Sequence, residues 1–302
     1  MRDSFSEDST RETDSSGYIR ALPRPTQEEL DTFYRELYYG NGVSSTYHQE
    51  YDASELNQKI LRAEATIEFI NRNIGTIQPV SLIEIGCGEG FALAAAKRAG
   101  WETLGVDYQS APVKKFNEEV LDCFVESDPR EYLEMLMEIP QKFDIAVLQN
   151  VLEHVIDPEQ LLTGLKGLVG DNGYILIQVP NDFSRTQQLA FEEGRIEREY
   201  WFTPPQHINY FNKQTLEAFC SAHGLRIVDG MSDFPIEMYL WGGHANYTND
   251  GQLGPFAHRA RVSLDLTLAE SGMEAYLDFY RAAYRVGLGR NLVVLVTPDL
   301  GA

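Results

Sequence analysis

The chain has few cysteines. Only Cys87, Cys123 and Cys220 occur in 302 residues, and they are far apart and without the spacing of metal ligands. An odd, scattered set of this kind indicates neither a disulfide framework nor a zinc site. Free thiols of this kind are typical of a reducing compartment, so we expect a cytoplasmic protein.

Long apolar runs are also missing. No stretch reaches the roughly 18 apolar residues that a membrane-spanning helix needs. Residues 1–17 lack the apolar core of a signal peptide. We therefore expect no membrane partner.

Basic side chains are scarce. The sequence has 25 Lys and Arg against 46 Asp and Glu, which gives a formal net charge of -21. The field of such a protein repels phosphate groups. Nucleic acid is therefore not an expected partner, and a small molecule is.

The N-terminal region divides into two segments. Residues 1–24 have almost no apolar content to offset the entropy of ordering, so we predict a disordered acidic tail. Residues 25–53 contain a helical apolar stripe and are interpreted as a hinged aromatic lid over the ligands, with core packing as the alternative. The tyrosines on which this interpretation rests are Tyr34, Tyr38, Tyr39, Tyr47 and Tyr51.

Strand-like and helix-like segments alternate after residue 54. Continuous apolar strands separated by helices are typical of a parallel sheet covered on both faces, so we predict a doubly wound α/β domain over residues 54–230 and 291–302. Two excursions, at 181–211 and 231–290, follow the fifth and sixth strands and are expected to build a substrate pocket. The predicted strands are residues 80–86, 102–108, 123–127, 143–150, 173–180, 225–230 and 291–298.

A glycine turn joins the first of these strands to a helix. Gly86, Gly88 and Gly90 allow a ligand to approach the backbone closely, and the helix end favours a nucleotide. The dinucleotide fingerprint requires its third glycine at position 91, where this chain has Phe91, so NAD is disfavoured. Asp107 ends the second strand, where a carboxylate can accept from both hydroxyls of a ribose.

The segments EIGCGEG, FDIAVLQNVLEHVIDP and GDNGYILIQVPN, together with Asp107, resemble class I S-adenosylmethionine-dependent methyltransferases of the small-molecule branch, which includes ubiquinone-pathway O-methyltransferases. The resemblance implies a Rossmann-like, seven-stranded sheet and S-adenosylmethionine as cofactor, with S-adenosylhomocysteine as product. It also implies that Glu84 and the turn hold the methionine end, Asp107 the ribose, and Ser127 with Asp128 the adenine amine. The implied cofactor-binding residues are Glu84, Gly86, Cys87, Gly88, Gly90, Asp107, Tyr108, Ser127, Asp128, Gln149 and Asn150.

Two histidines are candidates for catalysis. His154 follows Glu153 beside the expected methyl-transfer position, and His207 ends the first excursion. Each could be a general base, a metal ligand, or a residue that only fixes a turn. Some relatives that share the Glu-His pair complete a divalent-metal site with a further Glu where this chain has Asn150, so we do not predict a metal.

The acceptor is expected to be a small molecule, with aromatic residues as candidates for contacting it. We predict methylation of a hydroxyl group of a sugar or secondary metabolite. The alternatives are N-methylation of an amine, a NAD-dependent oxidoreductase, and a non-catalytic cofactor-binding protein; a monomer and a homodimer both stay open. The candidate acceptor-binding residues are Tyr34, Tyr38, Tyr200, Trp201 and Tyr210.

Overall fold

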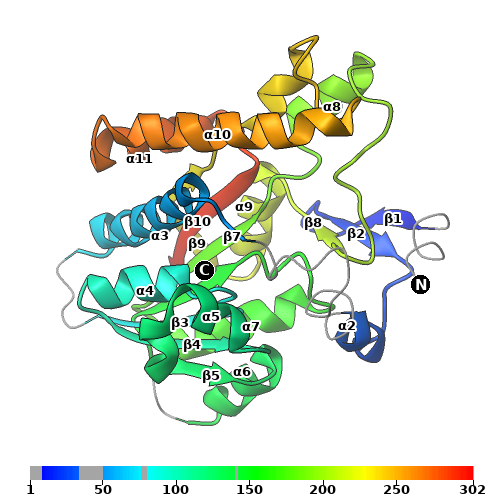
Figure 1. The fold of residues 1–302 in the computed structure, drawn as a ribbon. Coiled ribbons are helices and arrows are strands. Elements are labelled where there is room, and N and C mark those ends of the chain that lie inside the picture. The colour runs from blue at the N-terminus through cyan, green and yellow to red at the C-terminus, as the bar shows by residue number, and fades with distance from the viewer. Residues whose placement is uncertain (1–8, 34–49, 76–79, 140–141, 302) are drawn as a thin grey trace.

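A computed structural model describes residues 9–33, 50–75, 80–139 and 142–301 of the protein (Figure 1). Most of the predicted lid, including Tyr34 and Tyr38, lies outside the described residues. Among the described helices, none has both the length and the apolar character to cross a membrane.

A seven-stranded sheet forms the centre of the molecule, in the order β5-β4-β3-β6-β7-β10-β9. The predicted seven-stranded α/β fold is confirmed. Strands β3 to β7 pair in parallel, whereas β10 runs antiparallel to both β7 and β9, which departs from the parallel sheet expected. The strands are β3 (Ser81–Ile85), β4 (Glu102–Asp107), β5 (Phe124–Glu126), β6 (Ile145–Gln149), β7 (Tyr174–Pro180), β9 (Leu225–Ser232) and β10 (Asn291–Pro298).

Helices cover both faces of this sheet because alternate strand residues are apolar on each side. Ile83, Leu148 and Ile177 pack with one set of helices, α6 (Pro129–Met137), α7 (Pro158–Val169) and α9 (Lys213–Ala222). Val147 and Leu176 pack with the other set. That set consists of α3 (Ala53–Ile74), α4 (Phe91–Arg98) and α11 (Met273–Arg285), with α5 (Ala111–Phe116) and η3 (Glu118–Cys123) beside α4.

The predicted disorder of residues 1–24 is wrong for the part of this segment that forms strands. β1 (Thr10–Thr13) and β2 (Ile19–Leu22) build a small sheet with β8 (Asn209–Tyr210), and α2 (Gln27–Phe33) follows. Tyr18 is fully buried and stacks on Phe211, with ring centroids 4.7 Å apart. The partners of this segment come from the opposite half of the chain, so its own low apolar content did not reveal its order.

The two excursions pack onto the sheet domain. The first contains α8 (Arg185–Glu192) and β8. The second contains η4 (Ile236–Trp241), η5 (Gly251–Leu253), α10 (Gly254–Ala269) and α11. Figure 1 shows α10 and α11 lying over α3 at one side of the sheet. The buried carboxylate of Asp265 on α10 fastens this layer, because it accepts hydrogen bonds from Gln58 of α3 and from Tyr276 and Tyr280 of α11.

Candidate functional site

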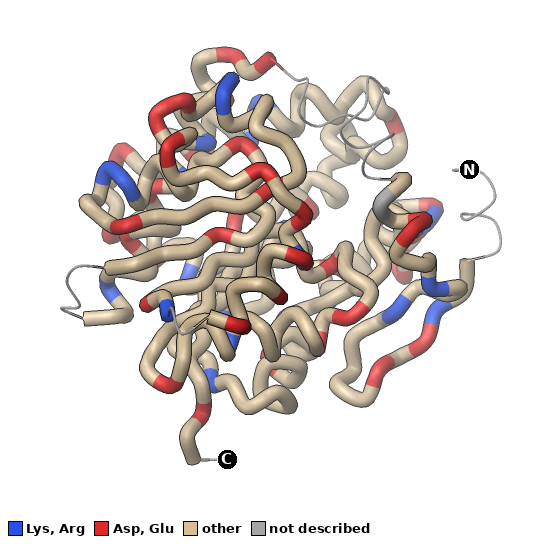
Figure 2. The backbone as a smooth tube through the Cα atoms, turned by 90° about the horizontal axis from the view of Figure 1, so that it is seen from below, with Lys and Arg blue, Asp and Glu red and all other residues tan. Residues whose placement is uncertain are grey.

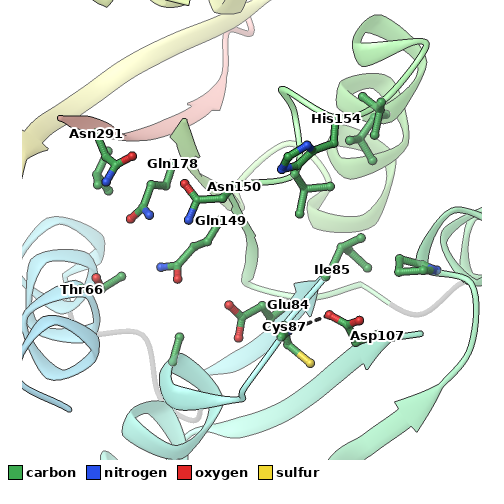
Figure 3. A pocket seen from close by; sticks show the side chains of 18 of the residues that line it. Thr66, Glu84, Ile85, Cys87, Asp107, Gln149, Asn150, His154, Gln178 and Asn291 are labelled. Atoms are coloured by element: carbon green, nitrogen blue, oxygen red, sulfur yellow. Dashed lines mark hydrogen bonds between the residues drawn. The ribbon is translucent and has the colours of Figure 1, made fainter. Parts of the chain in front are cut away.

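A cavity of about 1060 Å³ opens at the carboxyl ends of β3, β4, β6 and β7. The chain order of the strands reverses between β3 and β6, and ligands of open α/β sheets bind at this kind of switch point. The volume lies at the upper end of the roughly 300–1,000 Å³ of small-molecule pockets, so two molecules can share the cavity. Figure 3 shows its lining from β3, β6, β7 and α3.

The structure brings most of the sequence-predicted cofactor residues to this cavity. Gly90 is the N-cap residue of α4 and does not border the cavity, and the histidine that borders it is His154 rather than His207. The predicted residues that border it are Glu84, Gly86, Cys87, Gly88, Asp107, Tyr108, Gln149, Asn150 and His154.

Glycine is required in the turn at residues 86–90. Gly86, Gly88 and Gly90 have φ angles of 74°, 56° and 75°, in the region that side-chain-bearing residues rarely adopt. A Cβ atom on Gly86 would also lie 2.7 Å from a methyl group of Val151. The turn therefore keeps its backbone close to β6 and open to a ligand.

Two carboxylates stand on either side of this turn. Asp107 accepts hydrogen bonds from the backbone N–H groups of Gly88 and Tyr108, both at 2.7 Å, and so holds the turn against β4 (Figure 3). Glu84 is 2% exposed, and its Oε2 has no hydrogen-bond partner among the described residues. Burial, with the charge of Asp107 second, raises the pKa of Glu84 to about 8. Such a carboxylate favours a cationic partner.

The structure does not bring Ser127 and Asp128 to the cavity. Asp128 caps α6, accepting from the backbone N–H groups of Arg130 and Glu131, and the N–H of Ser127 donates to the carbonyl of Asp107. Pro129, Arg130 and Leu133 border this end of the cavity instead. The cap motif Asp-Pro at the start of a helix was the sequence signal for this role.

His154 and His207 lie together although 53 positions separate them. Their ring centroids are 4.9 Å apart. The backbone N–H groups of Ile208 and Asn209 both donate to the carbonyl of Glu153, which ties the two segments to each other. His154 Nδ1 lies 2.6 Å from the carbonyl of Gln206. Because a carbonyl only accepts, Nδ1 carries the proton and Nε2 is left with its lone pair.

Burial dominates the electrostatics around these rings. It lowers the pKa of His154 to about 3, with His207 adding to the effect, and it raises the pKa of Glu153 to about 8. Burial alone would raise the pKa of Asp182 as well, but Arg290 at 2.6 Å and His207 hold it below its ordinary value. His207 Nδ1 lies 3.7 Å from this carboxylate.

These residues could hold a cation. The ligand atoms of Glu153, His154 and His207 all lie within 4.8 Å of one another. Glu153 Oε2 is buried and has no hydrogen-bond partner among the described residues. We call this group the histidine cluster.

Of the aromatic residues predicted to bind the acceptor, the three that the structure describes, Tyr200, Trp201 and Tyr210, do not border the cavity. Trp201 and Tyr210 are each 2% exposed and pack with Tyr200 around Phe183 in a small core of their own. The hydroxyl of Tyr210 donates to the carbonyl of His207 at 2.6 Å, so this core supports the histidine segment. Apolar rings in a long excursion gain more from packing on one another than from facing a water-filled cavity.

Sequence reasoning missed other wall residues. Tyr276 and Tyr280 of α11 border the cavity, and their four-residue spacing on one helix face was the available signal. Thr66, Gln178 and Asn291 also border it, and no motif marked them.

A family model described as "Methyltransferase domain" matches residues 48–229. The chain belongs to this family. The resemblance seen in its motifs is thereby confirmed at the level of the family.

Similar proteins include ubiquinone biosynthesis O-methyltransferases. That of Stutzerimonas stutzeri is 30% identical over 102 residues, which is 33% of this chain and 44% of the relative. That of Azotobacter vinelandii is 28% identical over 155 residues, 49% of this chain and 65% of the relative. The chain therefore spans less than two thirds of the length of these curated relatives.

The structure is also similar to solved methyltransferase structures. The plantazolicin methyltransferase BamL, in complex with a triazolic desmethylPZN analog and SAH, has a TM-score of 0.51 at 13% identity. The similarity covers 90% of this chain and 94% of that one. At this identity the likeness concerns the fold.

Proposed function

We propose that the protein transfers a methyl group from S-adenosylmethionine to a hydroxyl group of a small molecule. One observation carries the proposal: a single cavity is bordered by the glycine turn, Glu84 and Asp107 at one end and by His154 at the other. A sugar or a secondary metabolite is the acceptor class we favour, and the O-methyltransferase names of its relatives support a hydroxyl over an amine.

The cofactor end would bind through complementary charge and hydrogen bonds. Asp107 would accept from the ribose hydroxyls beside Tyr108, and the turn would admit the methionine portion against its backbone. The unpartnered carboxylate of Glu84 fits the α-ammonium group. Gln149 and Asn150 lie at the end of the next strand, beside the expected sulfonium. When bound, the cofactor supplies the methyl group as an electrophile.

His154 is the general base in this proposal. Its Nε2 has a lone pair and the ring is neutral at neutral pH, but burial lowers its pKa to about 3 and so weakens it as a base, and proton transfer therefore depends on the carboxylate of Glu153 beside it. As the acceptor oxygen takes the methyl group from the cofactor, the hydroxyl proton would pass to Nε2 of His154. The neighbouring Glu153, once ionised, stabilises the imidazolium that forms. His207 keeps His154 in place and is the second candidate for the base.

The same methyl transfer could instead be assisted by a divalent cation bound to the histidine cluster. Two imidazoles and one carboxylate fit such an ion in kind, although relatives offer a further carboxylate where this chain has Asn150. A cation held by Glu153, His154 and His207 would lower the pKa of an acceptor hydroxyl. In that case chelators abolish turnover and Mg²⁺ restores it. In the metal-free form neither addition has an effect.

The charge of the protein supports a small-molecule partner over nucleic acid. Figure 2 shows acidic positions spread over strands, helices and loops, with the fewer basic positions scattered among them. We also propose a cytoplasmic location, because the described cysteines are unpaired.

Calorimetry tests the proposal directly. S-adenosylhomocysteine should bind to the purified protein and NAD should not, because Phe91 replaces the third glycine of the dinucleotide fingerprint. Transfer of a labelled methyl group to a panel of small acceptors then separates an enzyme from a non-catalytic binding protein. Binding of NAD in place of S-adenosylhomocysteine would refute the assignment.

A further inference from the structure

Three side-chain amides face the cavity without partners. Gln149, Asn150 and Gln178 border it, and in the described part of the chain their carboxamides make no hydrogen bond. Asn291 borders the cavity next to them, and Figure 3 shows the four side chains grouped above Glu84, with Thr66 of α3 opposite. We call Gln149, Asn150, Gln178 and Asn291 the amide strip.

The strip lies where apolar residues would be expected. Gln149 pairs in register with Gln178, and Gln178 with Val293, so the three side chains share the sheet face that packs on α3 and α11. The next residues inward on that face, Val147 and Leu176, are fully buried. Amides that end an apolar row and open onto a cavity are available to hydrogen-bond a ligand there.

The backbone next to the strip is also unusual. Asn150 has a φ of 53°, and its N–H donates to the carbonyl of Gln178 at 2.9 Å. A non-glycine residue in this conformation stores strain, which is typical of ligand sites. The strained residue therefore joins the two strands at the point where their amides enter the cavity.

The charges beside the strip cancel each other. Arg62 of α3 forms an ion pair with Asp233 at 2.7 Å, and Asp233 also accepts from the backbone N–H and the side-chain amide of Asn291. An anionic or cationic ligand group at this point would have no free countercharge. Neutral donors and acceptors, by contrast, match carboxamides, which offer both.

The strip extends past the proposed cofactor position. Asp107, Glu84 and Gln149 are on the adjacent strands β4, β3 and β6, which span about 10 Å at a strand spacing of about 4.8 Å. Gln178 on β7 and Asn291 on β10 lie about 5 and 10 Å farther in the same direction. A cofactor held by Asp107 and Glu84 leaves the amide of Gln178 and the side-chain oxygen of Asn291 for the second molecule.

We propose that Gln178 and Asn291, with Thr66 across the cavity, form an acceptor subsite for a neutral polyhydroxylated molecule of about the size of a sugar. The proposal rests on the proposed methyl transfer and narrows its acceptor. It excludes acceptors that present a carboxylate, a phosphate or an ammonium group at this subsite.

Three matched probes test the charge preference. They are 4-nitrophenyl β-D-glucoside, 4-nitrophenyl β-D-glucuronide and 4-nitrophenyl 2-amino-2-deoxy-β-D-glucoside, which differ in one neutral, acidic or basic group. Binding to the protein saturated with S-adenosylhomocysteine is measured by ligand-observed NMR at about pH 6, where the glucuronide carries its negative charge and the aminosugar its positive charge. The neutral glucoside should bind about tenfold more tightly than either charged probe, because an unpaired charge is desolvated beside the Arg62–Asp233 pair.

Substitution of Gln178 then locates the subsite. Gln178→Met keeps the side-chain length and removes the amide, so glucoside affinity should fall about tenfold while S-adenosylhomocysteine affinity stays unchanged. Gln178→Glu has the same shape with a carboxylate and should shift the preference toward the aminosugar. Gln252→Met, at an exposed position of η5, is the matched control and should change neither affinity.

Other outcomes would contradict the proposed subsite, each at a different point. A preference for the glucuronide or the aminosugar overturns the neutral class, and failure of all three probes to bind overturns the sugar-sized subsite. Loss of S-adenosylhomocysteine affinity in Gln178→Met would mean that the amide strip contacts the cofactor and not the acceptor. If the wild-type protein binds no S-adenosylhomocysteine, the proposed function fails first. Should Gln178→Met not fold, a shift of the Gln178 side-chain amide resonance on addition of glucoside to the wild-type complex decides, and no shift refutes the contact.

Discussion

The two ends of the cavity are built in different ways. At the cofactor end, Glu84, the glycine turn and Asp107 all lie within residues 84–107, on two adjacent parallel strands. At the histidine end, His154, His207, Asp182 and Arg290 come from four separate segments, and the N-terminal strand β2 braces them. One end therefore depends on local sequence, whereas the other depends on the packing of the whole chain.

Arg24 illustrates this dependence. Its guanidinium donates to the side-chain Oδ1 of Asn209 at 2.7 Å and to the carbonyl of Ile156, so it bridges the His207 and His154 segments. The buried amide of Asn209 donates in turn to the carbonyls of Leu152 and Val155. A residue from the segment expected to be disordered thus helps to set the distance between the two imidazoles.

Because the two ends are built independently, a substitution at the histidine end should lower the rate of methyl transfer without lowering cofactor affinity. The largest effect is expected at His154. His154→Ala should reduce methyl transfer by about 10²- to 10⁴-fold, the usual contribution of a general base, with S-adenosylhomocysteine affinity nearly unchanged. Turnover with the best acceptor of the panel, measured with labelled cofactor in the presence of chelator, checks this. His223→Ala, at the C-cap of α9 and outside the cavity lining, is the control. Full turnover in both His154→Ala and His207→Ala would leave positioning, or an amine acceptor, as the explanation.

Arg290 tests whether the histidine end depends on tertiary structure. Arg290→Leu leaves the carboxylate of Asp182, only 1% exposed, without its ion-pair partner. Removing one partner of a buried pair should lower the free energy of unfolding by about 3–5 kcal/mol. Arg185→Leu removes an exposed pair with Glu192 and should cost no more than about 0.5 kcal/mol in the same urea titration. Equal stabilities of the two variants would contradict the structural role of Arg290.

Asp107 tests the cofactor end alone. Asp107→Ala should weaken S-adenosylhomocysteine binding by roughly 1–3 kcal/mol, because the ribose hydroxyls lose their acceptor and the turn loses two hydrogen bonds. Calorimetry measures the loss, with exposed Asp122→Ala as the matched control. Unchanged affinity in Asp107→Ala would remove the ribose assignment.

The smallest expected effect is a pH dependence of cofactor binding through Glu84. Its pKa is raised to about 8 in the ligand-free protein, so the carboxyl is protonated at neutral pH, and an ammonium ligand favours its ionised form. Binding should therefore release a proton below pH 8, and affinity should rise with pH between about 6 and 7.5, by at most about tenfold per unit. Glu84→Gln should abolish this slope, which calorimetry in buffers of different ionisation enthalpy would reveal. A slope that persists in the variant rules out Glu84 as its source.

The ionisation of Glu84 also affects folding stability. Folding stability should fall as pH rises, whereas cofactor affinity should rise. A carboxyl whose pKa is higher in the folded than in the unfolded protein stabilises fully below the unfolded value and loses that contribution as pH rises through the folded value. The free energy of unfolding of the ligand-free protein should therefore fall as the pH rises from about 4.5 to 8, because Glu84 and Glu153 then ionise. Bound cofactor offsets the part that belongs to Glu84.

Much of the sheet domain could be predicted from sequence, because its signals are local. Continuous apolar runs mark buried strands, and the positive φ angles of Gly86, Gly88 and Gly90 require glycine wherever that turn occurs. The antiparallel direction of β10 could not be predicted, since an apolar strand has the same pattern in both directions. The structure uses the carboxylate of Asp128 to cap its own helix and leaves Ser127 and Asp128 outside the cavity lining, so their contact with the adenine amine stays a prediction.

The sequence by itself determined the α/β domain, the family, and the glycine turn with its two carboxylates, because residues near in the chain create those features through backbone geometry and strand pairing. Only the tertiary structure decided which histidine borders the cavity, that the core of Trp201 and Tyr210 supports the neighbouring His207 segment, and that Gln178 and Asn291 meet beside Gln149. These arrangements depend on contacts between segments far apart in the chain. No local pattern encodes them, because each residue is compatible with many partners until the layers pack.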